Sequence, residues 1–217
     1  MQKGLFITFE GTEGCGKSTQ VELLTQRIRA LGHRVHTLRE PGGTSIGEEI
    51  RHTLKHSKNN AAMTAEAELL LMNASRAQLV REIIRPALAA GEIVLCDRFY
   101  DSTIAYQGYG RGLDLKHVQA VIDFAIGETK SDLTLFLRVP PEISDERLRS
   151  RQSNLPFVRD RIEGADKSFF ARVAKGYKAI AATEPNRVHV LDGSGKIETV
   201  CENIWEIVQP ILPRIGR

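Results

Sequence analysis

The sequence predicts an α/β fold of three layers, with a five-stranded parallel sheet between helices. Five short runs rich in apolar and β-branched residues indicate buried strands, and amphipathic stretches with helical spacing separate them. Strands that alternate with helices pair in parallel through right-handed crossovers, which place helices on both faces of the sheet. At 217 residues the chain is expected to form one domain, residues 1–217.

The predicted strands share a short apolar core and end at glycine or polar residues, which break strands. They span residues 5–9, 35–38, 93–96, 133–137 and 188–191. The first ends at glycines, the second shortly before Pro41-Gly42-Gly43, and the fifth at Asp192-Gly193. Strands of four or five residues bounded in this way suit a sheet that helices cover on both faces.

The predicted helices fill the intervals between strands and carry apolar residues at near-helical spacing. They span residues 17–31, 45–57, a longer stretch from near 64, 115–126, 165–182 and 196–208. Gly32 is placed to cap the first. The helix from near Thr64 carries the apolar run Leu69-Leu70-Leu71-Met72, and Pro86 is expected to kink or end it.

Composition excludes several classes of protein. Hydrophobic residues make up 41% and charged residues 26%, which is ordinary for a soluble chain, and the net charge of +3 is too small to predict a nucleic-acid polymer or a membrane as partner. Cys15, Cys96 and Cys201 lie far apart, as in a protein of the reducing cytosol. The sequence lacks a signal peptide and any apolar run of about 20 residues. We therefore expect a cytoplasmic protein.

The most specific local signal is Gly11-Thr12-Glu13-Gly14-Cys15-Gly16-Lys17-Ser18, which matches the phosphate-binding pattern G-x-x-x-x-G-K-[ST]. It follows a predicted strand and opens a predicted helix, as this loop requires. The glycines let backbone N–H groups point at phosphate oxygens, and the helix N-terminus adds partial positive charge. We expect Lys17 to bind the β- and γ-phosphates of ATP and Ser18 to bind Mg²⁺. The fold prediction narrows to the P-loop NTPases.

Three charged residues are expected beside this loop. Asp97 follows the strand at 93–96, where a carboxylate that supports Mg²⁺ belongs, and Arg98 follows it in the crevice beyond the strand ends. Glu13 lies inside the loop, where a carboxylate repels phosphates, so accepting a hydrogen bond from a sugar hydroxyl is a better role. The competing interpretation is that Asp97 and Arg98 are surface residues at the end of a strand and that Glu13 only makes the loop more soluble.

Two segments admit more than one interpretation. Thr129-Lys130-Ser131-Asp132 fits the guanine-binding motif of GTPases, but it precedes a strand instead of following one, so we predict a turn. The arginines of about 145–163, which include Arg147, Arg149, Arg151 and Arg161, fit a solvated helix face that runs into a loop. Beside a phosphate site they also fit a lid.

Four stretches carry a family resemblance: Phe9-Glu10-Gly11 into the P-loop, Arg39-Glu40-Pro41-Gly42-Gly43-Thr44, Asp97-Arg98-Phe99 and Ala105-Tyr106-Gln107-Gly108. With them the chain resembles the thymidylate kinases over nearly its whole length. The resemblance implies phosphorylation of dTMP to dTDP by ATP, direct in-line transfer, Mg²⁺ as cofactor and a homodimer. Asp160-Arg161-Ile162-Glu163 resembles the end of the lid in the bacterial type, whose lid supplies arginines that the P-loop lacks, and Gly14 agrees with that type.

The resemblance also implies roles for single residues. Lys17, Arg98, Arg151 and Arg161 would be catalytic, and Arg98 with Arg51 would hold the phosphate of dTMP. The remaining substrate-binding residues would contact the sugar or the base: Glu13 at the 3′-hydroxyl, Tyr106 against the sugar, Arg76, Thr103 and Gln107 on the thymine edge, and Glu40 bracing that wall before a cis bond to Pro41. Met72 stands where many members have a phenylalanine that stacks on thymine.

Two alternatives remain open at this stage. One is a P-loop kinase of another nucleotide or small metabolite, against which the stretches at 39–44 and 105–108 argue. The other is a nucleotide-dependent switch protein. The position of 129–132 and the lack of a D-x-x-G motif after Asp97 count against it.

Overall fold

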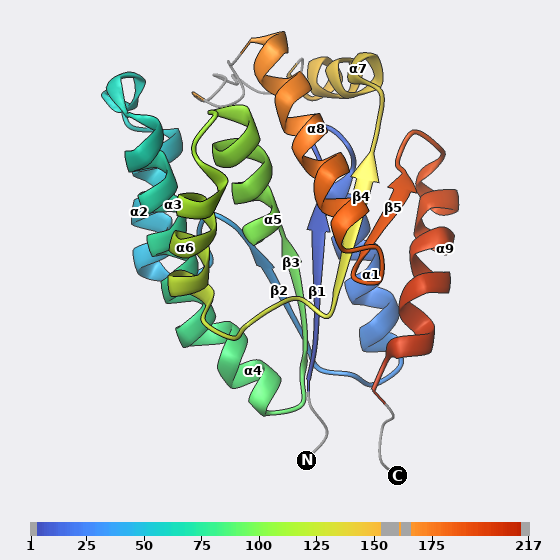
Figure 1. Cartoon of the computed structure of the whole chain (residues 1–217). Helices are drawn as coiled ribbons and strands as arrows, with labels where there is room; N and C mark the ends of the chain where they lie inside the picture. The colour runs from blue at the N-terminus through green and yellow to red at the C-terminus, as the bar shows by residue number, and fades with distance from the viewer. Residues whose placement is uncertain (1–3, 153–160, 162–165, 214–217) are drawn as a thin grey trace.

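The computed structural model describes residues 4–152, 161 and 166–213, with the backbone alone at 151 and 152. Its sheet has the strand order β2-β3-β1-β4-β5, and every neighbouring pair is parallel. The strands are β1 (Leu5–Glu10), β2 (Val35–Arg39), β3 (Ile93–Asp97), β4 (Leu133–Arg138) and β5 (Val188–Asp192). The predicted five-stranded parallel sheet is therefore confirmed, and all its strands point to the same edge (Figure 1).

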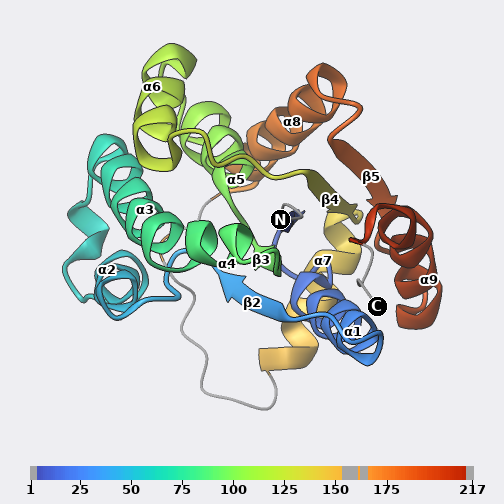
Figure 2. The ribbon, with the colours of Figure 1, turned by 90° about the horizontal axis from the view of Figure 1, so that it is seen from below.

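Alternate residues of the strands face two separate cores, which gives the predicted three layers. Ile7 and Phe9 pack with α1 (Lys17–Ala30) and α9 (Ile197–Val208) on one face. Phe6 packs on the other face with residues of α3, α4 and α6, and Phe136 packs there with α8. The bounds of these helices are α3 (Ala65–Leu79), α4 (Arg85–Ala89), α6 (Leu115–Ile126) and α8 (Lys167–Thr183). Figure 2 shows α1 and α9 across the sheet from α3 and α8.

The remaining helices lie around the carboxyl edge of the sheet and at its flank. They are α2 (Ser45–Lys55), α5 (Tyr100–Thr103) and α7 (Pro141–Gln152). Short 3₁₀ turns occur at Asn60–Ala62 and Gln209–Ile211. None of the helices in the described part of the chain is long and apolar enough to cross a membrane.

Two helical segments differ from the sequence predictions. The helix from near Thr64 does not end at Pro86: it becomes a π-helix over Val80–Ile84 and continues as α4, in whose first turn Pro86 lies. Pro86 directly follows the π-helix, which interrupts the regular i→i−4 hydrogen bonding of the α-helix, and a long helix can accommodate a proline at such an irregularity. The segment from α5 through a π-helix at Ile104–Gly110 was not predicted as helical. Its two glycines and irregular spacing conceal the helix, which packs closely against α8.

Register brings the chemistry-bearing ends of three strands together. Phe9 lies opposite Asp97 in the β1–β3 pair and opposite Leu135 in the β1–β4 pair. Arg39, the last residue of β2, lies opposite Asp97 on its other side. The residues after β1, β2 and β3 therefore converge at one edge of the sheet, where open α/β sheets bind ligands.

Candidate active site

The P-loop joins β1 to α1 at this edge and has the backbone that phosphate binding requires. Gly11, Gly14 and Gly16 have φ values of 141°, 74° and 98°, a region that suits glycine. A Cβ on Gly11 would lie only 2.4 Å from the carbonyl oxygen of Leu137. The glycines of the motif are thus demanded by backbone conformation and by the close passage of β4.

Lys17 lies at the start of α1 and bridges the loop. Its Nζ donates to the carbonyl oxygens of Gly11 at 3.1 Å and Thr12 at 3.0 Å. Burial and the charge of Arg98 lower the pKa of Lys17, but nearby negative groups, which include Glu13, outweigh them and raise the pKa above its ordinary value. Lys17 is therefore a cation at neutral pH, held over the loop.

Ser18 and Asp97, the two residues predicted to hold Mg²⁺, lie in contact. Ser18 Oγ donates to Asp97 Oδ2 at 3.0 Å, so two oxygen ligands lie side by side next to the P-loop. Among the described residues, no group of three or more His, Cys, Asp or Glu side chains could hold a metal. One hydroxyl and one carboxylate suit Mg²⁺, which takes most of its ligands from water and substrate phosphates.

Arg98 connects the P-loop to the neighbouring pocket. Its φ of 72° is the one positive value outside glycine among the described residues, and this backbone aims the side chain across the strand ends. Its guanidinium donates to Glu13 Oε1 at 2.6 Å, to Ser102 Oγ at 3.0 Å and to the hydroxyls of Tyr106 and Tyr177 at 3.3 Å each. The side chain is thereby preorganised at 13% exposure.

Glu10, at the end of β1, holds the backbone behind Arg98. Its Oε1 accepts from the N–H groups of Phe99 and Ser102, and its Oε2 accepts from the hydroxyls of Ser102 and Tyr177 at 2.6 and 2.7 Å. Burial and the charge of Asp101 raise its pKa, which Arg98 opposes. Our sequence analysis did not assign it a role, although a glutamate in an otherwise apolar strand was a usable signal.

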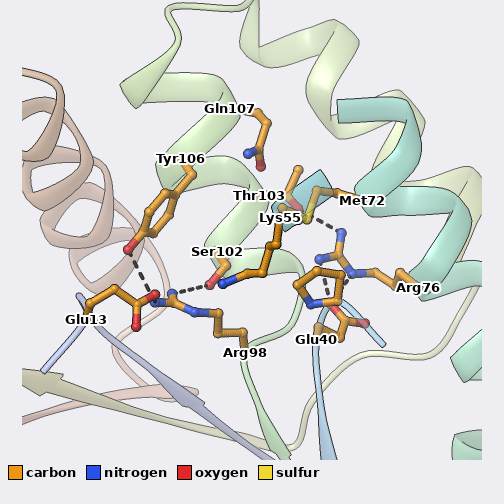
Figure 3. Close-up of a pocket in the computed structure, with 11 residues that line it drawn as sticks. Glu13, Glu40, Lys55, Met72, Arg76, Arg98, Ser102, Thr103, Tyr106 and Gln107 are labelled. Atoms are coloured by element: carbon orange, nitrogen blue, oxygen red, sulfur yellow. Dashed lines mark hydrogen bonds and ion pairs between the residues drawn. The ribbon is translucent and has the colours of Figure 1, made fainter. Parts of the chain in front are cut away.

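The predicted acceptor-binding residues meet in one pocket. Glu13, Arg98 and Tyr106 lie at one end, while Arg76 and Glu40 lie at the other (Figure 3). The pocket is also lined by Met72, Thr103 and Gln107 of the predicted set, and by Pro41, Lys55 and Ser102. Of the residues predicted to bind the acceptor, all but Arg51 therefore line it.

Charge at the P-loop end of the pocket is balanced. Burial raises the pKa of Glu13, but the positive charges of Arg98 and Lys17 outweigh it and hold this pKa well below its ordinary range. Burial raises the pKa of the Tyr106 phenol. Glu13 is therefore an ionised hydrogen-bond acceptor, and Tyr106 is a neutral ring whose face lies 5.1 Å from the Arg98 guanidinium carbon.

Arg76 forms the far wall, and its hydrogen bonds are already made within the protein. It donates twice to Glu40 Oε2, at 2.9 and 2.7 Å, and once each to Phe99 O, Asn73 Oδ1 and Thr103 Oγ1. These contacts match the five N–H donors of a guanidinium group. A base can receive a hydrogen bond from Arg76 only by exchanging or sharing one of them.

Glu40 is the buried partner of Arg76. Burial raises the pKa of Glu40 to about 7 against the opposing charge of Arg76. Its Oε2 takes both bonds from Arg76, whereas Oε1 is buried and has no hydrogen-bond partner among the described residues. The Glu40–Pro41 peptide bond is cis, as the resemblance implied.

The helix α2 contributes two cations to this side of the site. Arg51 donates to Pro41 O at 2.8 Å, which places it behind the pocket wall instead of on the lining. Lys55, one turn further along the helix, lines the pocket. Sequence analysis missed Lys55 because helical spacing from Arg51 was its only signal.

The arginines of the lid segment lie in different places. Arg147 on α7 donates to the carbonyl oxygen of Gly193 at 2.9 Å and contacts that of Gly14 at 3.5 Å. Arg161 donates to Met63 O at 3.0 Å and pairs with Glu68. The side chain of Arg151, and most of the predicted lid segment beyond it, lie outside the described residues.

A second pocket lies on the other side of the P-loop, between α7 and the turn after β5. It is lined by Gly14 and Gly16 of the loop, Thr19 and Gln20 of α1, Arg147 of α7 and Ser194 of the turn. The first pocket includes Glu13 of the P-loop and the second includes Gly14 and Gly16, so the two pockets reach the loop at neighbouring residues. The arginines of α7 had suggested a lid beside the phosphate site, whereas the turn after β5 carried no local signal for a ligand site.

Comparisons with known proteins agree with this geometry. The family model "Thymidylate kinase" matches residues 9–204. A thymidylate kinase of Synechococcus sp. (strain JA-2-3B'a(2-13)) is 44% identical over 209 residues, 96% of each chain, and one of Geobacter sp. (strain M21) is 43% identical over 215 residues, 99% of this chain and 95% of that protein.

A solved structure extends the likeness to three dimensions. The crystal structure of thymidylate kinase from Ehrlichia chaffeensis matches with a TM-score of 0.78 and 32% identity, and the match covers 95% of this chain and 100% of that one. The family model and the relatives each span nearly the whole sequence, P-loop and acceptor pocket included. The chain belongs to the thymidylate kinase family.

Proposed function

We propose an assignment of residues to the reaction of this family, in which ATP phosphorylates dTMP to dTDP. The observation that supports it best is the Arg98–Glu13 ion pair, because it joins the acceptor pocket to the P-loop and sets a phosphate-binding cation beside Lys17. Two substrates in these positions present their phosphates to each other. Alignment of this kind, with charge stabilisation, is what phosphoryl transfer requires.

On the donor side, the P-loop N–H groups and Lys17 bind the β- and γ-phosphates of ATP. The nucleoside extends into the second pocket, where Arg147 spans from α7 to the turn after β5. Ser18 and Asp97 hold Mg²⁺, which neutralises charge on the phosphate oxygens when bound. The whole chain works as one kinase domain, with the segment around 145–163 as its lid.

On the acceptor side, Arg98 binds the phosphate of dTMP, and Arg51 and Lys55 add positive charge from α2. Glu13 is an ionised acceptor beside Arg98 and takes the 3′-hydroxyl. Tyr106 lies against the sugar and leaves little space for a 2′-hydroxyl. Charge and shape at this end both favour a deoxynucleoside monophosphate.

At the base end, Thr103 and Gln107 bind the thymine edge and Met72 covers a face of the ring. Thr103 Oγ1 accepts from Arg76, so its own O–H points elsewhere and can donate to a base carbonyl. The hydrogen bond from Arg76 holds the hydroxyl of Thr103 in place. Arg76 itself binds the base only by sharing one of the hydrogen bonds that it makes within the protein. The thioether of Met72 offers a polarizable, adaptable contact in place of an aromatic stack.

The lid arginines act late in the reaction. Negative charge between donor and acceptor increases during transfer, so a guanidinium group aimed there is worth more in the transition state than before it. We assign this role to Arg151 and Arg161. Arg161 must exchange its bond to Glu68 for the phosphates when both substrates are bound.

The enzyme is a homodimer in this proposal, and it works in the cytoplasm. Leu70 on α3 and Phe124 on α6 are 57% and 84% exposed, and α3 and α6 pack against each other. Apolar side chains this exposed on neighbouring helices suit a surface that a second copy covers.

Removal of metal tests the assignment of Ser18 and Asp97. Turnover of ATP and dTMP, followed by ADP release, should disappear when EDTA is added in excess and return when Mg²⁺ is restored. The assay uses an ADP-coupling system supplied after quenching, so that EDTA acts on this enzyme alone. Full activity in EDTA would remove the metal from the proposal.

A further inference from the structure

One hydrogen-bonding group in the base end of the pocket is oriented from outside the pocket. We propose that Glu68, on α3, is a positioning residue that fixes the side-chain amide of Gln107 with its oxygen toward the base. The enzyme would thereby select a pyrimidine that carries N3–H, such as thymine, over cytosine. The inference rests on the proposed function of this pocket as the thymine site.

Glu68 is a buried carboxylate held by two arginines. Its side chain is 1% exposed. Arg111 donates from Nε to Oε1 at 3.2 Å and from Nη2 to Oε2 at 2.9 Å, and Arg161 also pairs with Oε2. Arg111 alone makes two hydrogen bonds to this carboxylate and stays in place if Arg161 moves to the phosphates, so Glu68 keeps a cationic partner, and a carboxylate paired in this way accepts hydrogen bonds. Whatever bonds to Glu68 must be a donor.

Gln107 is the third donor to this carboxylate. Its Nε2 donates to Glu68 Oε1 at 2.7 Å, and the side chain is 2% exposed. The reverse orientation of the amide would set its oxygen against a carboxylate oxygen, two acceptors in contact, and would leave buried N–H groups without that partner. Glu68 therefore determines that the nitrogen of the amide faces the carboxylate and that the oxygen faces away from it.

The other end of the amide faces the pocket. Gln107 lines the pocket beside Met72 and Thr103, and Figure 3 shows its oxygen on the side of Thr103. Because Nε2 is bonded to Glu68, the amide oxygen is the acceptor that this side chain offers to a ligand in the pocket. The pocket thus presents a fixed acceptor at the base end.

A fixed acceptor discriminates between pyrimidines at N3. Thymine carries a hydrogen on N3, which Gln107 Oε1 can accept, whereas the unprotonated N3 of cytosine is itself an acceptor. The Thr103 hydroxyl can rotate to donate or accept, so it adapts to either base. Gln107 cannot adapt, because rotation of its amide breaks the bond to Glu68. Sites that fix a buried hydrogen-bonding group in this way reject ligands that leave it unpaired.

The test compares kcat/KM for dTMP, dUMP and dCMP. Glu68→Gln replaces the carboxylate by an amide that can donate or accept, so the Gln107 amide can reverse. We expect the preference for dTMP over dCMP to fall about tenfold, the loss of one oriented hydrogen bond. The preference for dTMP over dUMP should stay within twofold, because both bases carry N3–H. A general loosening of the fold would not separate these two ratios.

Two further variants keep the test decisive. Glu68→Asp retains the charge opposite Arg111 but withdraws the carboxylate from Gln107, so it should reduce the preference for dTMP over dCMP. This variant provides the test even if Glu68→Gln does not fold. Glu66→Gln makes the same chemical change at an exposed position of α3 and should match the wild type. An unchanged dTMP-to-dCMP ratio in a folded Glu68 variant, or equal loss of both ratios, overturns the inference. A wild type without preference for dTMP would instead refute the proposed function.

Discussion

Arg98 illustrates at the scale of one residue how the site is preorganised. Its guanidinium is held by the P-loop through Glu13 and by α8 through Tyr177, while Glu10 fixes the backbone beside it. Sequence reasoning found Arg98 and Glu13 because each lies next to a motif. It missed Tyr177 because the bond of Tyr177 to Glu10 joins residues 167 positions apart, a separation that no local pattern encodes.

Arg98→Ala should weaken the use of dTMP. Loss of a charge-assisted hydrogen bond to the acceptor phosphate costs about 1.5–3 kcal/mol, a roughly tenfold to hundredfold fall in kcat/KM for dTMP. Arg98→Lys keeps the positive charge but loses the forked N–H donors of the guanidinium group. Its kcat/KM for dTMP should lie between those of Arg98→Ala and the wild type. Arg34→Ala, at an 81% exposed side chain, is the control. Steady-state kinetics with dTMP and ATP varied in turn would exclude this role if only the ATP dependence changed.

Glu40 should make stability depend on pH. Burial raises its folded-state pKa from 4.5 to about 7, so between these values the folded protein binds more protons than the unfolded chain. Stability from this group is therefore present below about pH 4.5 and is lost as the pH rises towards 7. The free energy of unfolding of the wild type, minus that of Glu40→Gln, should decrease by about 1–3 kcal/mol from pH 5 to pH 8.

Urea unfolding at each pH measures this difference. The variant shares every other titrating group with the wild type, so the subtraction isolates residue 40. A difference that is flat, or that increases with pH, would mean that Arg76 keeps Glu40 ionised throughout.

At the scale of elements, the sequence predicted most of the fold and little of its irregular parts. The five strands and helices such as α6 carry their own apolar patterns, so their bounds were predicted closely. The π-helix at Ile104–Gly110 was missed because packing stabilises it: a Cβ on Gly176 of α8 would lie 2.9 Å from the ring of Tyr109. Long-range contacts of this kind leave no periodic signal.

Helix α7 offers a matched pair of arginines. Arg147 lines the second pocket, in which the nucleoside of ATP is proposed to bind, and it donates a hydrogen bond to Gly193 O. Arg149 on the same helix is exposed. Arg147→Ala should raise KM for ATP about fivefold to tenfold, the effect of one lost hydrogen bond of about 1 kcal/mol or slightly more, with little change in KM for dTMP. Arg149→Ala should resemble the wild type in both. Equal effects of the two variants would point to a general contribution of charge instead of a contact.

At the scale of the whole molecule, the proposed dimer depends on the exposed apolar side chains of α3 and α6. Phe124→Glu on α6 should convert a dimer into a monomer, because a carboxylate buried at an interface without a partner is strongly unfavourable. Lys178→Glu introduces the same group on α8 and should leave the dimer intact. Size-exclusion chromatography with light scattering gives the mass directly. A wild type that is monomeric at micromolar concentration would contradict the proposed dimer.

The central proposal is that two nucleotides meet at the P-loop, and selectivity for the acceptor tests this arrangement most directly. ADP release should be measured in a coupled assay with ATP and Mg²⁺ over dTMP, dUMP, dCMP, dGMP and dAMP at equal concentrations. We expect the highest turnover with dTMP, because Arg98 recognises its phosphate, Tyr106 its deoxyribose, and Thr103 with Gln107 its base edge. Turnover with dTMP that is no greater than with dCMP, dGMP or dAMP would contradict the account.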